Sequence, residues 1–256
     1  MASRKEQKEQ LRAERLERES AEEAKRRRQR LVQYGSAAAF LAICVVAVLI
    51  VVSQTGGGSG GDTNLEGVAQ VQAQLRGIPQ HGTVLGDPKT NVTVVEFGDL
   101  QCPVCQAFST QIAPSLITDL VRKGTANYEF RQFTIIGPES TPAAKAALAA
   151  GEQGRYWNFI ETFYRNQGTE NSGYVTDDFL TAIAEAAGVP DIGKWNTDRQ
   201  SSKWDAVLSR TQAQAQAFGF TGTPSILVEG PGGKKPFPGS AVPTLTQIED
   251  AVKSVS

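Results

Sequence analysis

The sequence predicts an α/β domain whose core is divided by a helical insertion and which follows one N-terminal transmembrane helix. Strand-like segments rich in β-branched residues occur before and after a stretch of helical character, residues 141–218. An uncharged apolar run, residues 37–52, lies near the N-terminus. Strands on both sides of a helical block indicate that the block interrupts a single sheet-based core.

Residues 1–33 are predicted to form a charged tail on the cytoplasmic side of a membrane. Residues 1–30 hold eleven Lys and Arg and seven Asp and Glu, without an apolar repeat at a helical period. The chain as a whole has 26 basic and 27 acidic residues, so the remainder is mildly acidic. An acidic domain argues against nucleic-acid binding, which needs a basic face.

Residues 34–53 are predicted to be an uncleaved transmembrane signal anchor. Every residue from Ala37 to Val52 is apolar, Cys44 among them, and about 20 such residues span the hydrocarbon core of a bilayer. Basic residues are concentrated on the N-terminal side of this apolar run, so the positive-inside rule places the rest of the chain outside the cytoplasm. A cleaved signal peptide is the alternative, but its charged region would be shorter and followed by a small-residue cleavage site. We therefore expect a single-pass protein of the cell membrane with an extracytoplasmic domain.

Residues 54–74 are predicted to be a flexible linker, because the run 56–61 reads GGGSGG. The folded domain is expected to cover residues 75–256, with the helical insertion at about 139–218. The other expected elements are strands at 92–97, 128–136 and 225–228, an edge strand after the turn GPGGKKPFPG, and helices at 102–123 and 243–255. Pro114 should kink the first of these helices, and Thr244 or Thr246 should cap the last.

The pair Cys102 and Cys105 forms a C-x-x-C motif around Pro103 and Val104, between a predicted strand and a predicted helix. The partial positive charge of a helix N-terminus should lower the pKa of the Cys102 thiol below its free value of about 8.5. Cys105 lies one turn further on the same face and could resolve a mixed disulfide. A purely structural disulfide across so short a loop would stabilise the fold little. The motif therefore predicts thiol–disulfide exchange.

A metal site is not expected. The chain has three cysteines and one histidine, and His81, Cys102 and Cys105 could supply three ligands at most. A structural zinc site takes four protein ligands. We expect neither a metal nor another cofactor.

The run VVEFGDLQCPVC resembles the active-site segment of the thioredoxin superfamily, and within it the DsbA-like branch. The run Gly222-Thr223-Pro224-Ser225 before a strand, and the helical block between the two halves of the core, strengthen the resemblance. It covers about residues 80–256 and implies a thioredoxin-like fold with an inserted helical subdomain. It also implies that Pro224 is a cis proline opposite the cysteine pair and that Thr223 contacts the substrate.

The same resemblance adds Pro103 and Val104 to the substrate-binding residues and assigns a role to Glu96. Glu96 interrupts an apolar strand six residues before Cys102, and burial would raise the pKa of its carboxyl. The resemblance implies that Glu96 accepts the proton of the resolving thiol, Cys105. An edge-strand carboxylate facing water is the alternative. Asp99 is expected to be a turn or cap residue before the helix.

The resemblance implies a protein-disulfide oxidoreductase, and more closely an oxidase that introduces disulfides into exported proteins through Cys102 and Cys105. Exported protein thiols would be its substrates. A quinone-linked membrane partner, DsbB-like or similar to vitamin K epoxide reductase, would reoxidise it. Val104 stands where strongly oxidising members have histidine, so a reductase or isomerase using the same cysteines is an alternative. A non-catalytic binding or chaperone module is another, against which the intact cysteines count.

Overall fold

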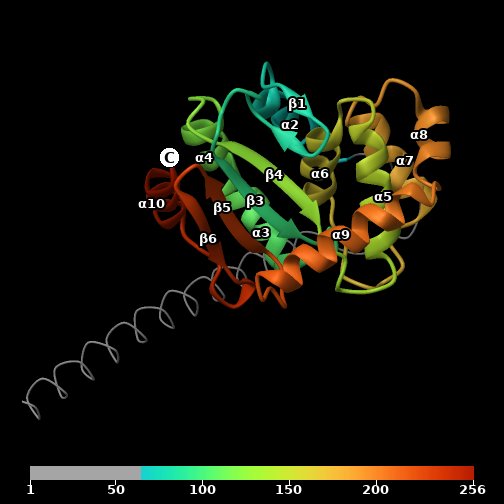
Figure 1. Cartoon of the computed structure of the whole chain (residues 1–256). Coiled ribbons are helices and arrows are strands. Elements are labelled where there is room, and N and C mark those ends of the chain that lie inside the picture. Colours follow the sequence, from blue (N-terminus) through green and yellow to red (C-terminus); the bar gives the residue numbers. More distant parts are fainter. Residues whose placement is uncertain (1–64) are drawn as a thin grey trace, which may run out of the picture. The chain divides into compact units, whose positions relative to one another are not determined.

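The computed structural model describes residues 65–256, and the centre of this part is a six-stranded sheet (Figure 1). Its strands are β1 (Gln80–His81), β2 (Val84–Leu85), β3 (Thr93–Gly98), β4 (Asn127–Gln132), β5 (Ser225–Gly230) and β6 (Gly233–Phe237). They lie in the order β1-β2-β4-β3-β5-β6. β3 and β4 run parallel, and the other neighbouring pairs are antiparallel. The strand before the cysteine pair, β3, is therefore paired on both edges.

The side chains of β3 alternate between two apolar clusters, one on each face of the sheet. Val94 belongs to the main core, whereas Val95 and Phe97 belong to a smaller cluster. Successive residues of a strand point to opposite faces, so Glu96 shares the face of Val94. The main core on that face also contains Cys105 and Phe108, both from the helix that begins directly after Cys102.

That helix is broken more sharply than the sequence predicts. Residues 102–123 form α3 (Pro103–Gln111), α4 (Ala113–Leu116) and a π-helical turn, η1 (Ile117–Val121). The break falls at Ile112, just before Pro114, which lies in the first turn of α4. Pro114 has no N–H to donate to the carbonyl of the preceding turn, and its ring would clash with that carbonyl. A new helix therefore begins where proline is tolerated.

The predicted insertion is confirmed as a group of helices between β4 and β5. It consists of α5 (Ser140–Gly151), α6 (Tyr156–Arg165), α7 (Asp177–Ala186), α8 (Ile192–Asp198) and α9 (Lys203–Ala217). Figure 1 shows α6 between the sheet and the more distant α7 and α8, with α9 leading back toward β5. Every residue of α6 from Tyr156 to Tyr164 is buried, so the aromatic side chains of α6 belong to the core.

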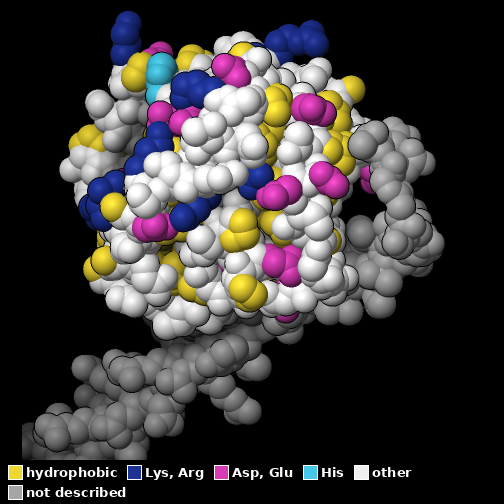
Figure 2. Space-filling view, turned by 90° about the vertical axis from the view of Figure 1, so that its right-hand side faces the viewer, with side chains coloured by type: hydrophobic (Ala, Val, Ile, Leu, Met, Phe, Trp, Pro, Cys, Tyr) yellow, Lys and Arg dark blue, Asp and Glu magenta, His cyan; other side chains and the backbone are white. Residues whose placement is uncertain are grey.

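The outer face of this insertion is mixed in character. In Figure 2 its apolar side chains lie scattered among polar ones rather than in one continuous patch. Within residues 65–256, Ile135 is the only large hydrophobic side chain classed as exposed. Scattered apolar residues are normal on a soluble surface. This face of the described part therefore suggests no docking surface.

The folded part begins earlier than the sequence predicts. Residues 68–75 form α2 (Val68–Leu75), and its residues Val71 and Leu75 are buried in the main core. The expectation of a flexible linker over residues 54–74 is therefore wrong for residues 65–74. The remainder of the predicted linker lies outside the described residues.

Two element ends near the core also differ from the prediction. β4 ends at Gln132 rather than at residue 136, because the N–H groups of Ile135 and Ile136 bond to the side chain of Asp99 instead of a strand. The last helix, α10, spans Leu245–Val255. Thr244 caps it through a capping box with Gln247, which confirms one of the two expected caps.

The predicted membrane anchor, residues 34–53, lies outside the described residues, as does Cys44. Within residues 65–256, no helix is both long and apolar enough to cross a membrane.

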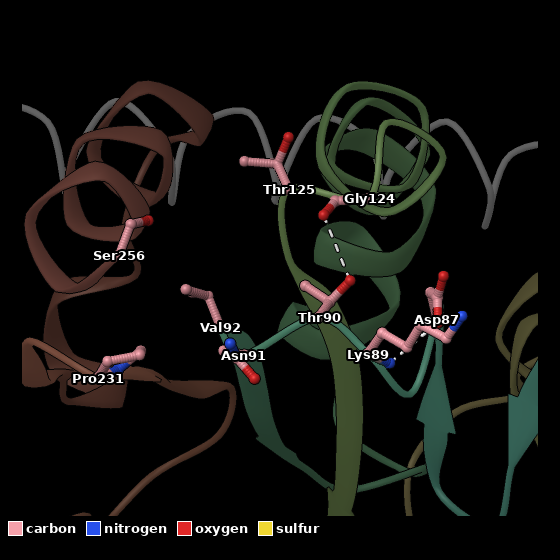
Figure 3. Close-up of a pocket in the computed structure, with 9 residues that line it drawn as sticks. All are labelled: Asp87, Lys89, Thr90, Asn91, Val92, Gly124, Thr125, Pro231 and Ser256. Atoms are coloured by element: carbon pink, nitrogen blue, oxygen red, sulfur yellow. Dashed lines mark hydrogen bonds between the residues drawn. The ribbon is translucent and has the colours of Figure 1, made fainter.

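A pocket lies at the end of the sheet where β3 begins (Figure 3). Its volume is about 480 Å³, and it is lined by Asp87, Lys89, Thr90, Asn91, Val92, Gly124, Thr125, Pro231 and Ser256. The Thr90 hydroxyl donates a hydrogen bond to the Gly124 carbonyl at 3.3 Å there. Because β3 runs from Thr93 to Gly98, this pocket is at the opposite end of the strand from the cysteine pair.

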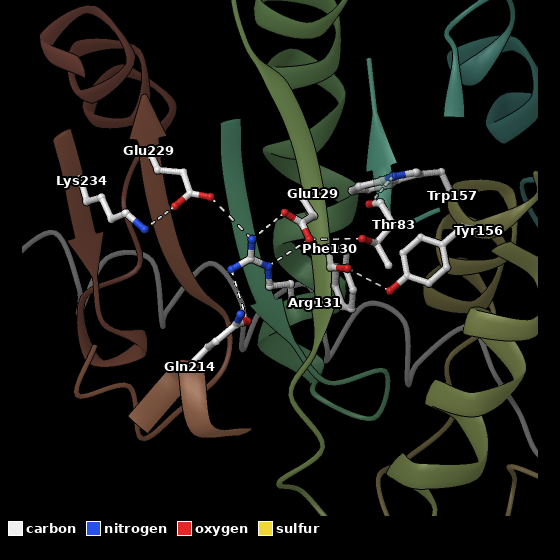
Figure 4. A network of polar contacts seen from close by, with 9 residues as sticks. All are labelled: Thr83, Glu129, Phe130, Arg131, Tyr156, Trp157, Gln214, Glu229 and Lys234. Atoms are coloured by element: carbon white, nitrogen blue, oxygen red, sulfur yellow. Dashed lines mark hydrogen bonds and ion pairs between the residues drawn. The ribbon is translucent and has the colours of Figure 1, made fainter. Parts of the chain in front are cut away.

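A network of charged side chains connects β4, β5, β6 and α9 on the face of the smaller cluster (Figure 4). Arg131 on β4 pairs with Glu129 at 2.8 Å and with Glu229 on β5 at 3.5 Å. It also donates to Gln214 of α9 at 3.4 Å, and Lys234 on β6 pairs with Glu229 at 2.9 Å. Within this network, the bond from Arg131 to Gln214 links α9, the return helix of the insertion, to the sheet.

Candidate active site

Cys102 is the N-cap residue of α3, at the point where the chain leaves the sheet. Its backbone is extended, and its Sγ accepts a hydrogen bond from the N–H of Cys105 at 3.4 Å. Pro103 occupies the first turn, where its missing N–H would have no partner in the helix anyway. Both cysteines are free thiols and both are buried. The N-cap position of Cys102 confirms the expected placement at a helix start.

The Thr223–Pro224 segment lies against Cys102, although 121 residues separate Thr223 from it along the chain. The Thr223–Pro224 peptide bond is cis. The Cys102 thiol donates to the carbonyl oxygen of Thr223 at 3.4 Å. Ser225 fixes this loop, because its hydroxyl donates to the Gly222 carbonyl at 2.7 Å and accepts from the Gly239 N–H at 2.8 Å.

The surroundings lower the pKa of the Cys102 thiol from its ordinary value of 9.0. The largest cause is a hydrogen bond from the Cys105 thiol, and burial opposes it. Thr223 and the N–H groups of Cys105 and Val104 add to the lowering. The Thr223 hydroxyl has no partner within the described chain, so it is free to turn toward the sulfur when the thiol ionises. Cys102 is the thiol better suited to attack, since the thiolate is the nucleophile.

The pKa of the Cys105 thiol moves the other way, well above its ordinary value. Burial is the largest cause, followed by the hydrogen bond to Cys102 and the negative charges of Cys102 and Glu96. The two thiols thus differ strongly although they lie one helical turn apart. Cys102 is thus the thiol that ionises more readily, whereas Cys105 keeps its proton.

Glu96 lies beneath the cysteine pair with only 1% of its surface exposed. The Tyr128 hydroxyl donates a hydrogen bond to its Oε2 atom, whereas Oε1 has no partner within residues 65–256. Burial, opposed by that hydrogen bond, raises the pKa of Glu96 to about 8. The alternative of an edge-strand carboxylate facing water is therefore wrong. Glu96 is close enough for its charge to raise the pKa of Cys105.

The loop before Cys102 is organised by Asp99, which is fully buried. Its Oδ1 atom accepts from the Gln101 N–H at 2.9 Å, as expected of a turn residue. Its Oδ2 atom accepts from the N–H groups of Ile135 and Ile136, at 2.8 and 2.9 Å. Asp99 therefore joins the loop after β3 to the loop after β4.

The inserted helices add a residue that the sequence did not reveal. Gln167, in the loop between α6 and α7, donates its side-chain N–H groups to the carbonyl oxygens of Leu100 and Cys102, at 2.6 and 3.2 Å. In the same loop the Asn171 N–H donates to the Gln101 side chain at 2.8 Å. A single glutamine 65 residues from Cys102 follows no local pattern, so only the folded chain shows this contact.

The described residues hold no group of three or more His, Cys, Asp or Glu side chains that could bind a metal ion. His81 lies on β1, an outer strand, and is not brought to the cysteine pair. The structure thus brings together Glu96, Cys102, Cys105 and the Thr223–Pro224 segment. It leaves Pro103, Val104 and Thr223 half-buried around them. This arrangement suits thiol–disulfide exchange with a thiol or a disulfide of another molecule.

Comparison with known proteins agrees with this chemistry. Residues 80–237 match the thioredoxin family. The probable disulfide bond formation protein D of Bacillus cereus is 31% identical over 149 residues, which cover 57% of this chain and 69% of that protein. The oxidised BdbD structure from Bacillus subtilis has a TM-score of 0.59 at 24% identity, covering 69% of this chain and 95% of that one.

A third comparison points the same way. A thioredoxin-like oxidoreductase from Silicibacter pomeroyi has a TM-score of 0.55 at 30% identity, covering 71% of this chain and 95% of that one. The thioredoxin-like fold with its helical insertion is thereby confirmed. The chain belongs to the thioredoxin family, and it is a DsbA-like protein-disulfide oxidoreductase.

Proposed function

We propose that this protein is an extracytoplasmic oxidase that donates a Cys102–Cys105 disulfide to exported proteins. The observation that carries the proposal is the opposite shift of the two pKa values, down at Cys102 and up at Cys105. A stabilised Cys102 thiolate favours the reduced form of the pair, which makes its disulfide the stronger oxidant. The relative from Bacillus cereus, named for disulfide bond formation, agrees with this direction.

The reaction begins with a substrate thiolate that attacks Cys102 Sγ of the oxidised pair. A new sulfur–sulfur bond forms there while the Cys102–Cys105 bond breaks, and the electron pair of the broken bond stays on Cys105 Sγ. A proton moves from the Glu96 carboxyl to this sulfur. A second substrate thiolate then attacks the substrate sulfur of the mixed disulfide and releases Cys102 as a thiolate. The substrate is oxidised by two electrons and the cysteine pair is reduced by two.

Substrate binding is proposed for the four residues that surround Cys102. Pro103, Val104 and Thr223 are half-buried beside it, and Pro224 is buried behind them. An extended substrate segment could lie along the backbone of Thr223, whose carbonyl already contacts the Cys102 thiol.

The reduction potential of the Cys102–Cys105 pair is set without a histidine between the cysteines, since Pro103 and Val104 stand there. Val104 packs against the main core, and its contribution to the Cys102 pKa comes from its main-chain N–H. Main-chain groups and neighbouring thiol and hydroxyl groups therefore carry the stabilisation. We expect a potential less oxidising than that of DsbA, about −120 mV, and above that of thioredoxin, about −270 mV.

The proposed location follows from the sequence before the described residues. The charged tail and the apolar run 37–52 support a single-pass anchor with the domain outside the cytoplasm. An oxidase there needs a membrane partner that returns electrons to quinone, DsbB-like or similar to vitamin K epoxide reductase. Fusion of a reporter that is active only outside the cytoplasm, placed after residue 256, tests the orientation.

The deciding experiment measures the reduction potential of the Cys102–Cys105 pair against glutathione. An oxidase should lie between about −120 and −180 mV, and the oxidised protein should form disulfides in a reduced substrate protein. Cys102→Ser should abolish this transfer. A potential near that of thioredoxin would instead favour the reductase alternative. Undiminished transfer by Cys102→Ser would contradict the role of the pair altogether.

A further inference from the structure

A second buried carboxyl group lies close to the active site. Glu161, in the middle of α6, is 1% exposed, and its Oε2 atom has no hydrogen-bond partner within the described chain. Glutamate is almost never fully buried unless it is paired. An apolar residue in this aromatic helix would avoid the cost of burying a carboxyl group. The position therefore calls for a function.

Glu161 faces the active-site helix and the sheet at the same time. Ser109 of α3 and Arg165, one turn further on α6, are near enough to lower its pKa. On the sheet side, its charge raises the pKa of Glu96 on β3 and of Tyr128 on β4. Glu161 is thus a neighbour of the carboxyl group that exchanges a proton with Cys105.

Buried polar atoms continue from this pair toward the surface. Glu96 Oε1, Ser109 Oγ, Glu161 Oε2, Arg165 Nε and Gln74 Nε2 are all buried and have no partner within residues 65–256. Arg165 donates to the Gln74 side chain at 3.4 Å, and both of these residues are half-buried at the contact between α6 and α2. Unpartnered buried polar groups are rare in folded proteins. Here Glu161 has Glu96 on one side and Arg165 on the other, and Arg165 contacts Gln74 of α2.

The acidities of the two carboxyl groups suit proton transfer between them. Burial is the largest cause for both, and it raises the pKa of Glu161 to about 7 and that of Glu96 to about 8. Around neutral pH, Glu161 ionises first, and its negative charge favours the protonated form of Glu96. Two adjacent buried carboxylates cannot both be ionised cheaply.

We propose that Glu161 is a positioning residue that acts on Cys105 through Glu96, by sharing one proton with it and returning that proton from the solvent side. When Cys105 leaves Cys102, the proton of Glu96 moves to Cys105 Sγ. The pair of carboxylates then carries two negative charges and takes up one proton from solvent at the Arg165 end. The proton passes from Glu161 to Glu96, which restores the starting state. This inference rests on the proposed role of Glu96.

The test is the pH dependence of thiol–disulfide exchange in Glu161→Gln. The oxidised full-length protein is mixed with a small dithiol, and the rate is expressed per substrate thiolate between pH 6 and 9. In the unmodified protein, this rate should fall with rising pH as Glu96 loses its proton, at a pH well above the ordinary carboxyl pKa because Glu96 is buried. Without the charge of Glu161, the fall should move to lower pH by roughly one pH unit. Glu161→Asp, which keeps the charge, should restore most of the parent profile.

Thr162→Val is the matched control, because Thr162 is the neighbouring buried residue of α6 and its hydroxyl is also unpartnered within the described chain. It should leave the pH profile unchanged. An unmoved profile in Glu161→Gln, with exchange intact, overturns the role of Glu161 alone. Two other outcomes would contradict the proposed mechanism instead. In one, the unmodified protein exchanges no disulfides. In the other, Glu96→Gln leaves its exchange rate unchanged.

A measurement on a protein that keeps Glu161 covers the case in which Glu161→Gln does not fold. Infrared difference spectra of the Cys102→Ser/Cys105→Ser protein follow the carboxyl stretching bands with pH. The proposal expects two buried carboxyl groups that lose their protons in separate steps, near pH 7 and near pH 8. If Glu96→Gln removes the step at the higher pH, that step is the loss of the proton of Glu96. Complete ionisation of both groups by pH 6 would overturn the proposal.

Discussion

The side chain of Gln167 donates a hydrogen bond to the carbonyl oxygen of Cys102 at 3.2 Å. A second bond, of 2.6 Å, reaches the carbonyl of Leu100. Gln167 lies in the helical insertion, in the loop between α6 and α7, whereas Cys102 lies between β3 and α3. The backbone that positions the Cys102 sulfur is therefore held by a residue of the helical insertion. Such support from neighbouring residues keeps a reactive group in its productive geometry.

Gln167→Ala should therefore loosen the N-cap of α3. We expect a loss of about 1–2 kcal/mol in the free energy of unfolding, from two removed hydrogen bonds. We also expect the pKa of Cys102 to rise toward its ordinary value, because the sulfur would meet the Cys105 N–H less often. Thiolate absorbance against pH measures the second effect.

Gln153→Ala separates this effect from simple destabilisation. Gln153 also joins two segments of the insertion, donating to the Asp191 carbonyl at 2.9 Å and accepting from its N–H at 2.9 Å. It should lower stability by a similar amount and leave the Cys102 titration unchanged. If both variants shift the titration equally, the contact with Cys102 has no specific role.

The sequence predicted the parts of the site that depend on local pattern. The strand, C-x-x-C motif and helix in sequence predict that Cys102 lies at the start of a helix, and Cys102 is the N-cap of α3. The strand before it was evident from its β-branched residues, and the segment around Thr223 from its resemblance to known active sites. The placement of Glu96 on the inner face follows from strand alternation once β3 is known to be covered on both sides.

The remaining features depend on tertiary contacts. The helix α2 buries only Val71 and Leu75. Their burial depends on contact with α6, which the local sequence does not show. Gln167 and Glu161 obtain their neighbours only when the insertion folds against α3. Glu161 is buried because α6 is surrounded by α2, α3, α5 and α7, and no periodicity within a ten-residue helix reveals that.

Thr223→Val tests how far the Thr223 hydroxyl stabilises the thiolate. Valine keeps the shape of the side chain and removes an oxygen that has no partner within the described residues. The fold should keep its stability, and the pKa of Cys102 should rise because one stabilising group is lost. Thr221→Val is the control, since Thr221 lies two residues away and is exposed. Identical Cys102 titrations in both variants would argue against this role.

Glu96→Gln should slow the step in which Cys105 joins or leaves the disulfide by about 100-fold or more. The amide can still accept the hydrogen bond from Tyr128 but cannot exchange a proton with the sulfur. Rapid mixing of a preformed mixed disulfide at Cys102 measures the attack by Cys105 directly. Glu129→Gln, on the adjacent strand and in the Arg131 network, is the control. An unchanged rate in Glu96→Gln would leave Glu96 a structural residue.

The two buried carboxyl groups also make folding depend on pH. Their ordinary pKa value is 4.5, and the fold raises it to about 8 for Glu96 and about 7 for Glu161. Between these values the unfolded chain has released protons that the folded chain still holds. Unfolding therefore releases protons, so the free energy of unfolding falls as the pH rises. The stabilisation is fully present below pH 4.5 and is lost once both groups ionise in the folded state.

We expect the free energy of unfolding of the Cys102→Ser/Cys105→Ser protein to decrease from about pH 5 to about pH 8. Each carboxyl group contributes at most about 1.4 kcal/mol per pH unit, the free energy equivalent of one pKa unit. The serine background is needed because the lowered pKa of Cys102 acts in the opposite sense, raising stability up to the ordinary thiol pKa. Chemical denaturation at a series of pH values measures the slope. Adding Glu96→Gln and Glu161→Gln should flatten the slope, because an amide does not titrate. An equally steep slope in that variant would show that other groups cause the pH dependence of stability.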